Sequence, residues 1–522
     1  MSRRSTWTPG RDAAAVRHPG VAGRSDDGGR HHVAVVGGGV AGMAAATALV
    51  ERGVAVTLLE SCEQLGGRVR SWPVEDEASA GAGGTRTMSR GFHAFFRQYY
   101  NLRAMLRRAD PALQRLQAVA DYPLLSRQGH QDSFARIPRT PPVNLLAFVL
   151  RSPTFTIRDL TKIDTAAAGE LLDVDFPRSF TDHDGESAAQ FLDRLRFPDA
   201  ARHLALEVFA RSFFADPEDF SAGELIGMFH TYFLGSAEGL LFDVPDDDYD
   251  TALWAPLATY LRTRGADVRT RTPVTGLRSD GDGVVLQTDG GDVHADAVVV
   301  ATDLRTTQHL LGPGALDGDA ADLTTWHDQL AALRPAPAFA VWRLWLDRPA
   351  SPERPAFLGT AGFGPTDNIS VVERFEARAA DWARRTGGSI VELHAYALPA
   401  DADHDDVRRQ LRGTLDELYP EFVGARAVAE QYLVNADCPL IGTEPWAERP
   451  GVASPDPRVL LAGDGVRCAF PVALMERAAT TGFQAANALL AGWQLAGHDL
   501  WTVPLGARTR FARHAGQAAS RV

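Results

Sequence analysis

The chain has 522 residues and 45% hydrophobic content, which is enough to bury a large core and favours two connected domains over one. The formal net charge of −13 argues against a nucleic-acid partner, because phosphate groups are neutralised by a basic surface. The three cysteines lack metal-ligand spacing, so we expect neither a disulfide framework nor a metal site, and we expect a cytoplasmic location.

Residues 1–30 are polar and rich in Gly, Arg and Ser, which predicts a disordered leader. Arg3 and Arg4 form a twin-arginine pair, but no apolar segment follows them before the first expected strand, so we expect no export. Further along the chain, no window holds the roughly 20 apolar residues of a membrane-spanning helix.

Residues 32–59 predict a strand–helix–strand unit. Residues 32–36 are apolar and β-branched, as in a buried parallel strand, and residues 43–52 form an Ala-rich helical stretch that Gly53 ends. A second apolar strand is expected over residues 54–59. This order is that of the βαβ unit that opens a dinucleotide-binding domain.

The turn between the first strand and the helix satisfies G-x-G-x-x-G with Gly37, Gly39 and Gly42. We expect Gly37 to permit the tight turn, Gly39 to let the backbone approach a pyrophosphate at the helix N-terminus, and Gly42 to let helix and strand pack closely. Glu60, which ends the second strand, can accept hydrogen bonds from ribose hydroxyls. The alternative is a glycine-rich turn in an unrelated α/β protein.

A second glycine pair follows the ribose acid. Gly66, Gly67 and Arg68 have no role in the nicotinamide-binding pattern and resemble the flavoprotein version of it. The resemblance implies a loop that wraps back over the pyrophosphate, with Arg68 facing its charge. It favours FAD over NAD, although the tripeptide alone is also compatible with a surface turn.

Residues 251–303 form a second segment of this kind. An amphipathic helix is followed by an extended strand over residues 268–274 and by a hairpin around residues 280–283, and an apolar strand ends the segment. The segment resembles the flavoprotein arrangement in which the backbone of a valine, here Val274, contacts the adenine and the last strand returns beside the dinucleotide.

The third segment is an apolar strand over residues 459–464 that ends in Gly463 and Asp464 and precedes a helix opening near Met475. Asp464 can accept hydrogen bonds from the ribityl hydroxyls, and the positive end of the helix can lie near the N1–O2 edge of the flavin. One strand–Gly–Asp–helix unit also has a purely structural explanation, but three segments in this order indicate a single flavin site.

Together these motifs resemble the flavin amine oxidase and carotenoid desaturase superfamily, from about residue 30 to residue 500. The resemblance implies a two-domain α/β (α+β) fold, with a Rossmann-like, p-hydroxybenzoate-hydroxylase-like FAD domain, an inserted substrate domain and non-covalent FAD. The active site is expected between the domains. The expected boundaries are a leader at 1–30, a discontinuous FAD-binding domain at 31–95, 250–310 and 455–500, a substrate domain at 96–249 and 311–454, and a C-terminal tail at 501–522.

Residues 91–101, which read Gly-Phe-His-Ala-Phe-Phe-Arg-Gln-Tyr-Tyr-Asn, narrow the resemblance to the carotene desaturases, and among them to the isorenieratene synthases of actinobacteria. That group implies that β-carotene is the substrate, that its β-ionone rings are desaturated, and that one C1 methyl group migrates to C2. The methyl shift is intramolecular, so no second nucleotide site is needed. Arg97 and Gln98 depart from the plant desaturase pattern, which has small residues at these positions, so we expect a different geometry facing the substrate.

His93 is the candidate catalytic base, because it lies in the Gly-x-His run after the first flavin segment and a histidine there can accept a proton. A structural hydrogen bond from a partly buried ring is the alternative. A hydrophobic polyene needs few polar contacts, so we expect an aromatic tunnel, with an ordinary helical core as its alternative. The candidate tunnel residues are Phe213, Phe214, Phe229, Tyr232, Phe233, Leu240 and Phe242.

Residues 142–150 are apolar and are flanked by Arg136, Arg139 and Arg151. The stretch is too short to cross a bilayer, but it suits a helix lying among lipid headgroups, with Leu146 and other apolar side chains such as Phe148 in contact with lipid. Packing into the core is the alternative. Peripheral contact with the inner face of the membrane is therefore one of two hypotheses.

Alternative functions stay open. A desaturase or isomerase of an acyclic carotene would keep the same flavin site. An amine oxidase-like enzyme is disfavoured, because such enzymes commonly keep a lysine near the flavin, whereas Lys162, the only lysine, follows no flavin motif. A non-catalytic prenyl or lipid carrier, similar to the Rab GDP-dissociation inhibitors, would have a decayed phosphate site. The electron acceptor stays unknown at this stage.

Overall fold

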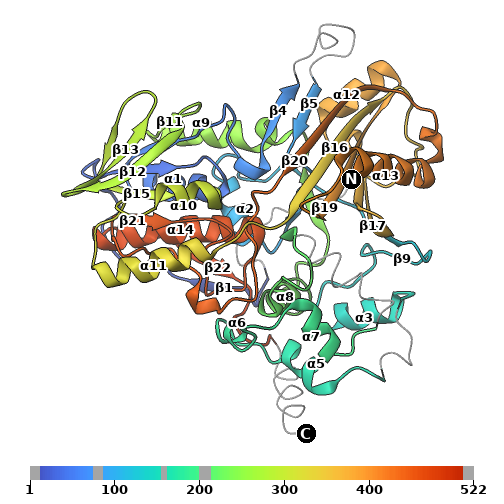
Figure 1. The fold of residues 1–522 in the computed structure, drawn as a ribbon, viewed down its shortest axis with the longest axis horizontal. Helices are drawn as coiled ribbons and strands as arrows, with labels where there is room; N and C mark the ends of the chain where they lie inside the picture. Colours follow the sequence, from blue (N-terminus) through green and yellow to red (C-terminus); the bar gives the residue numbers. More distant parts are fainter. Residues whose placement is uncertain (1–11, 75–85, 155–160, 199–212, 509–522) are drawn as a thin grey trace.

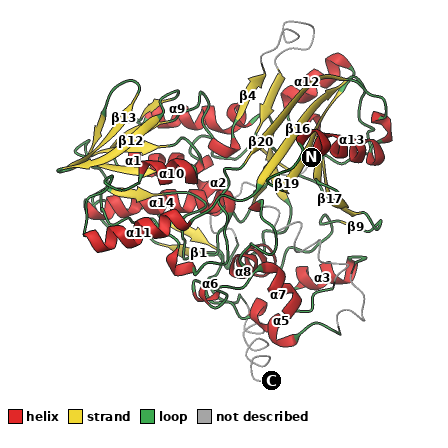
Figure 2. Ribbon diagram, in the orientation of Figure 1, coloured by secondary structure: helices red, strands yellow, loops and turns green. Residues whose placement is uncertain are grey.

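The computed structural model describes residues 12–74, 86–154, 161–198 and 213–508. Two large β-sheets lie side by side, and a group of short helices lies beneath the second of them in the view of Figure 1. Figure 2 shows that helices cover both sheets. No helix in the described ranges combines the length and the hydropathy that crossing a bilayer requires.

The first sheet is parallel throughout and has the strand order β11-β3-β2-β15-β21. Its inner strands are buried runs of Val, Leu and Ala, as expected of parallel strands that are covered on both faces. The predicted FAD-domain segments all contribute to it, so they meet in one sheet, while their boundaries stay a prediction. The strands are β2 (His32–Val36), β3 (Ala55–Leu59), β11 (Asp267–Arg269), β15 (Ala297–Val300) and β21 (Val459–Leu461), and the helices beside them are α1 (Val40–Val50), α10 (Leu304–Leu310), α11 (Ala320–Ala332) and α14 (Leu474–Gly492).

The second sheet has the strand order β20-β16-β19-β18-β17-β8-β9, and all its pairings are antiparallel except that of β8 with β17. Both regions predicted for the substrate domain contribute strands to it. Its elements are β8 (Leu124–Ser126), β9 (Gln131–Asp132), β16 (Ala338–Leu346), β17 (Phe357–Phe363), β18 (Thr366–Val371), β19 (Ser389–Leu398) and β20 (Ala427–Asn435), with helices α12 (Ala377–Thr386) and α13 (His404–Leu418) packed against it.

Smaller elements complete the fold. The remaining strands are β1 (Val16–His18), β4 (Ser71–Val74), β5 (Arg86–Ser89), β6 (Phe95–Phe96), β7 (Leu116–Ala118), β10 (Phe242–Pro245), β12 (Val274–Asp280), β13 (Gly283–Thr288), β14 (Val293–Ala295) and β22 (Leu500–Thr502). The remaining α-helices are α2 (Tyr100–Leu106), α3 (Val143–Arg151), α5 (Thr165–Leu172), α6 (Arg178–Thr181), α7 (Ala188–Arg194), α8 (Ala222–Phe229) and α9 (Ala255–Thr263).

The predicted disordered leader is wrong for the part of it that the structure describes. Strand β1 pairs antiparallel with β22. Asp12 accepts hydrogen bonds from the guanidinium of Arg508 and from the amide of Ala237, and Arg17 pairs with Asp499. These partners lie far away in the sequence, so local composition alone could not reveal the order. Residues 1–11 lie outside the described residues.

The strand expected over residues 268–274 is interrupted. Strand β11 ends at Arg269 and β12 begins at Val274, because Arg271 adopts a left-handed backbone conformation with φ of 52°. The turn is held by hydrogen bonds from the Arg271 amide to the Cys62 carbonyl and from the Thr272 amide to the Glu60 carbonyl. These contacts bring the start of β12 to the end of β3, where Glu60 lies.

Candidate active site

A cavity of about 650 Å³ lies between the two sheets. One part of its wall is built from backbone and polar side chains at the carboxyl ends of the parallel strands, and the other part is aromatic. The predicted cofactor residues that line it are Gly37, Gly39, Glu60, Gly66, Gly67, Arg68, Val274, Gly463, Asp464 and Met475. His93 lines it as well, and Gly42 lies behind the wall on α1.

The glycine-rich turn after β2 has little room for side chains. Gly37 has φ of 104°, and a Cβ there would lie 2.5 Å from the Ala301 carbonyl oxygen. A Cβ on Gly42 would lie 1.9 Å from the Gly37 carbonyl oxygen, so a larger residue would push α1 away from β2. Gly39, in contrast, faces open space except for the Cα of Gly67, 3.8 Å away, so a ligand can approach its backbone closely.

The second glycine loop folds against the first. Gly66 and Gly67 both have positive φ, and the Gly66 amide donates to the Gly38 carbonyl at 2.9 Å. A Cβ on Gly66 would lie 2.5 Å from the indole nitrogen of Trp254, which in turn donates to the Val69 carbonyl. The loop therefore lies against the first glycine turn, and its position over a pyrophosphate stays a prediction.

Glu60 is buried at the end of β3 with its carboxylate in a fixed orientation. One oxygen accepts from the Gly38 amide at 2.7 Å, and the other accepts from the Cys62 amide at 2.7 Å and from the Ser61 hydroxyl. These bonds hold the carboxylate at the cavity wall, where its remaining lone pairs can accept from a ribose.

Arg68 and Asp464 form a bidentate pair across the cavity wall, with N–O distances of 2.5 and 2.9 Å. The pair joins segments 396 residues apart in the chain. Cys438, which the sequence reasoning did not single out, lies beside it. Burial raises the pKa of this thiol to about 11, so it stays protonated at neutral pH.

Helix α14 begins at the cavity, where Leu474 has φ of 52° and both Leu474 and Met475 line the wall. The first N–H groups of a helix have no intrahelical partner, so this end presents partial positive charge to the cavity. Val274, the first residue of β12, lines the same cavity near Glu60. A glycine cradle, a buried carboxylate and the N-termini of α1 and α14, which both border the cavity, fit a dinucleotide.

The model of the family described as flavin containing amine oxidoreductase matches residues 40–490. The chain belongs to this family. Its cofactor is accordingly FAD, and the chain is an FAD-dependent oxidoreductase. The glycine loops, Glu60 and the Arg68–Asp464 pair are the residues of this family member that would hold the FAD.

Similar proteins show which branch of the family the chain resembles. This amine oxidoreductase family member is 54% identical over 506 residues to "Carotenoid phi-ring synthase" of Streptomyces griseus, an alignment that covers 97% of this chain and 96% of the relative. It is 27% identical to the protein of the same name from Chlorobaculum tepidum, with 90% of each chain covered. It is therefore a carotenoid desaturase-like enzyme. The relatives are named for phi-ring formation, so the finer isorenieratene assignment stays a proposal.

Solved structures of two oxidoreductases confirm the expected fold class. An oxidoreductase from Methanosarcina mazei aligns with a TM-score of 0.62 at 15% identity, covering 87% of this chain and 99% of its own. Wild-type putrescine oxidase bound to putrescine aligns with a TM-score of 0.61 at 15% identity, covering 88% and 99%. At this identity the likeness concerns the fold alone.

The aromatic part of the cavity contains most of the predicted tunnel. Phe214, Tyr232, Phe233, Leu240 and Phe242 line it. The other two do not: Phe213 packs on Phe220, and Phe229 stacks behind Phe233. Further aromatic residues that the sequence did not indicate complete the wall, namely Phe92, Phe96, Tyr99, Tyr122, Phe134, Phe339, Phe357 and Tyr396.

His93 is a weak base in this site. Its Nδ1 lies 2.8 Å from the Gly91 carbonyl oxygen, and burial lowers its pKa to about 4. Tyr249 packs edge-on against the ring and also donates to the Gly91 carbonyl. The geometry corresponds to the structural alternative stated above, and a catalytic role for His93 stays a prediction.

The sequence reasoning missed a polar row on β19. Glu392, His394 and Tyr396 alternate with apolar residues, so their side chains lie on one face of the strand. His394 and Tyr396 line the cavity, and Glu392 lies directly behind them. The alternation itself was the available signal, but it does not reveal which face borders the cavity.

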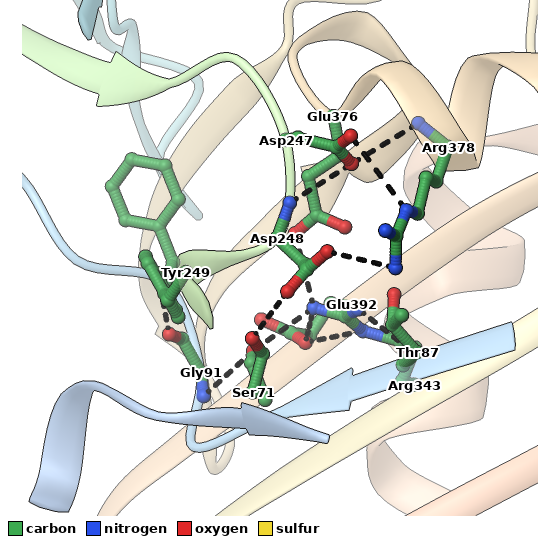
Figure 3. Close-up of polar contacts among 12 residues, drawn as sticks. Ser71, Thr87, Gly91, Asp247, Asp248, Tyr249, Arg343, Glu376, Arg378 and Glu392 are labelled. Carbon is green, nitrogen blue, oxygen red and sulfur yellow. Dashed lines mark hydrogen bonds and ion pairs between the residues drawn. The ribbon is translucent and has the colours of Figure 1, made fainter. Parts of the chain in front are cut away.

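A buried charge cluster supports this row (Figure 3). Arg343 donates to Glu392 at 2.7 Å and to the Thr87 carbonyl at 2.9 Å, and lies 3.6 Å from Glu376. Burial would raise the pKa of Glu392, but Arg343 and His394 outweigh it and lower that pKa to about 2. Burial raises the pKa of Glu376 to about 7. Of the two glutamates, Glu392 is therefore the stronger acid, and it is ionised at neutral pH.

Proposed function

We propose that this enzyme aromatises the β-ionone rings of β-carotene, with intramolecular 1,2-migration of a methyl group, as in isorenieratene formation. The observation that carries the proposal is a single cavity in which a dinucleotide cradle is continuous with an aromatic wall. The 54% identity to a carotenoid ring synthase supports a reaction at the ring end of the substrate.

The reaction balances as two oxidations for each ring, in which two hydrides and two protons leave. FAD, when bound, supplies the hydride acceptor, and an external two-electron acceptor must then regenerate it. Loss of the second hydride leaves an allylic cation, the C1 methyl group moves to C2 with its bonding electrons, and a proton leaves C2. The aromatic wall of the cavity can stabilise this cation and keep water away from it.

An amine oxidase reaction has less support. Lys162, the only lysine of the chain, is exposed and does not line the cavity. A polyene without amino groups suits the predominantly aromatic wall better than a polyamine does.

Expression in a β-carotene-producing host tests the function. We expect carotenoids that have lost four hydrogens for each ring converted and that carry aromatic methyl signals in NMR spectra. A parallel host that accumulates an acyclic carotene is the control. Conversion in that host, with β-carotene unchanged in the first, would favour the acyclic alternative and contradict the ring proposal.

We also propose that α3 rests on an anionic membrane surface. Val143, Leu146 and Leu150 on this helix are 52%, 61% and 69% exposed, an unusual concentration of bare aliphatic side chains. Three exposed arginines flank the helix, which suits acidic headgroups. These arginines are Arg136, Arg139 and Arg151.

The opposite face of α3 supports the same proposal. Phe148 is buried, so the expectation that it faces lipid is wrong; its ring packs on Phe134 and Phe233. Asn144 donates to the Phe233 carbonyl at 2.6 Å. Because Phe134 and Phe233 line the cavity, α3 lies directly over its aromatic end. A carotenoid leaving a bilayer at α3 would have a short path to the cavity.

A further inference from the structure

Tyr396, His394 and Glu392 form a continuous hydrogen-bonded row from the cavity wall into the protein. The Tyr396 hydroxyl lies 2.6 Å from Nδ1 of His394, and Nε2 of His394 lies 2.8 Å from a carboxylate oxygen of Glu392. Arg343 binds the other carboxylate oxygen at 2.7 Å. Each member is held by two or more partners, so the row is fixed in space.

The proton positions in this row follow from its chemistry. An ionised Glu392 only accepts hydrogen bonds, so Nε2 of His394 carries a proton. The Phe92 amide also points at Nε2, but its 3.4 Å distance is far weaker than the 2.8 Å contact with the carboxylate. In neutral imidazole the other nitrogen, Nδ1, is then an acceptor, so the Tyr396 hydroxyl donates to it.

Tyr396 lies at the junction of the two parts of the cavity. Phe214, a member of the aromatic wall, packs edge-on against its ring at 4.9 Å. Cys438 lies near Tyr396 on one side and near Arg68 on the other. The phenol oxygen also accepts from Asn368 at 3.0 Å, which fixes its position in the wall.

The row depends on a glycine, Gly91, in the loop beside it. Gly91 has φ of 104°, and a Cβ there would lie 2.7 Å from Cε1 of His394. The glycine that opens the Gly-x-His run therefore makes room for the imidazole of His394. The histidine bonded to a carboxylate is His394, whereas Nδ1 of His93 lies beside the Gly91 carbonyl oxygen.

We propose that Tyr396 is the catalytic residue that takes up the proton lost from the carotenoid ring, with His394 and Glu392 as its proton acceptor and positioning residue. The inference rests on the proposed function. In each oxidation a ring C–H bond breaks and its proton binds the phenol oxygen, while the phenol proton moves to Nδ1 of His394. The resulting imidazolium is stabilised by the Glu392 carboxylate, as in other histidine–carboxylate pairs.

The first test compares variants of the purified holoenzyme on the carotene that the wild type converts. We expect Tyr396→Phe to lower kcat by about 10²-fold to 10⁴-fold, the usual contribution of a positioned acid–base group. Flavin content and the Kd for the carotene should stay at wild-type values. Tyr432→Phe, on strand β20 of the same sheet, is the matched control, because Tyr432 pairs with His404 outside the cavity. Equal kcat in Tyr396→Phe and the wild type overturns the proposal.

The second test needs no turnover. Imidazole ¹⁵N NMR on holoenzyme with labelled histidine should show His394 with its proton on Nε2, and Glu392→Gln should alter that signal. A proton on Nδ1 at neutral pH overturns the relay, because Nδ1 then has no lone pair for the Tyr396 proton. If β-carotene is not converted but another carotene is, the ring proposal fails while the variant comparison on that carotene still decides the relay.

Discussion

Single residues in this site are held by partners far away in the sequence. Arg68 and Asp464 bind each other through two hydrogen bonds, and Glu60 is oriented by the amides of Gly38 and Cys62. Fixed charges of this kind need little rearrangement when a ligand arrives, so binding energy is not lost in ordering the site. The cost of changing one of them should therefore appear in cofactor affinity.

Glu60→Gln tests the predicted ribose contact. The amide keeps one acceptor oxygen but loses the charge, and hydrogen bonds to charged groups contribute about 1.5–3 kcal/mol. We expect FAD to bind roughly tenfold to 100-fold more weakly, measured by titration of the apoprotein with FAD. Glu63→Gln, at an exposed carboxylate in the same turn, should leave the affinity unchanged. An unchanged affinity in Glu60→Gln would remove Glu60 from the binding site.

The glycines and acids of the flavin loops could be predicted because each meets a local requirement. Gly42, for example, has no room for a side chain, since a Cβ would lie 1.9 Å from the Gly37 carbonyl oxygen, and Glu60 is a carboxylate at the end of a strand. His394 could not be predicted in this way. Its role depends on Gly91 and Glu392 together, and on β19 being placed between β16 and β18 with one face toward the cavity. No short stretch of sequence carries that information.

At the scale of elements, α3 divides its side chains between two environments. Asn144 and Phe148 face inward, whereas Leu146 and Leu150 face outward. From the sequence, core packing and membrane contact were alternatives. In the structure, one face of the helix packs into the core, and the opposite face is exposed and available for membrane contact. A short amphipathic helix makes both possible, because residues four positions apart share a face.

Substitution of the outer face tests the membrane proposal. The double change Leu146→Glu with Leu150→Glu should reduce co-sedimentation with phosphatidylglycerol vesicles at least tenfold, since each buried leucine contributes about 1.5–3 kcal/mol. The melting temperature should stay near that of the wild type. Val423→Glu, at an equally exposed valine elsewhere, should bind like the wild type. Undiminished binding by the double variant would contradict the proposal.

The two sheets differ in how far local patterns predict them. The inner strands of the parallel sheet are apolar runs beside recognisable turns, and the flavoprotein resemblance predicts that their segments meet, although it does not give the strand order. In the other sheet, β8 and β17 pair although more than 200 residues separate them, and nothing in either strand specifies the other. The tertiary arrangement decides such pairings, and Arg271 shows the same effect on a smaller scale by breaking an expected strand.

At the scale of the whole molecule, buried neutral histidines in separate parts of the fold make its stability fall at acidic pH. Nε2 of His230 carries a proton and donates it to the Pro504 carbonyl oxygen, 2.7 Å away. His498 lies 2.9 Å from the Ala48 carbonyl oxygen at the base of α1. Burial lowers the pKa of each to about 4. The folded state therefore resists protonation that the unfolded chain accepts.

The sign of the pH effect follows directly. Above the unfolded pKa of about 6.5 both histidines are neutral in both states; as the pH falls toward 4, the unfolded chain binds protons first and stability is lost. At pH 5 each histidine should cost about 2 kcal/mol. Between pH 7.5 and pH 5, we expect the melting temperature to fall less in His230→Gln and in His498→Gln than in the wild type. His404→Gln, at an exposed site, should behave like the wild type, and identical losses in all variants would contradict the assignment.

The order of strands in the parallel sheet also has a consequence for biosynthesis. Strand β15 lies between β2, near the N-terminus, and β21, which ends at residue 461 of 522. The ribosome must therefore synthesise the more than 400 residues that separate β2 from β21 before β21 can add to the sheet. Until then a nascent chain exposes an unpaired apolar strand edge, so the cell's chaperones should determine the yield of this protein as much as its final stability does.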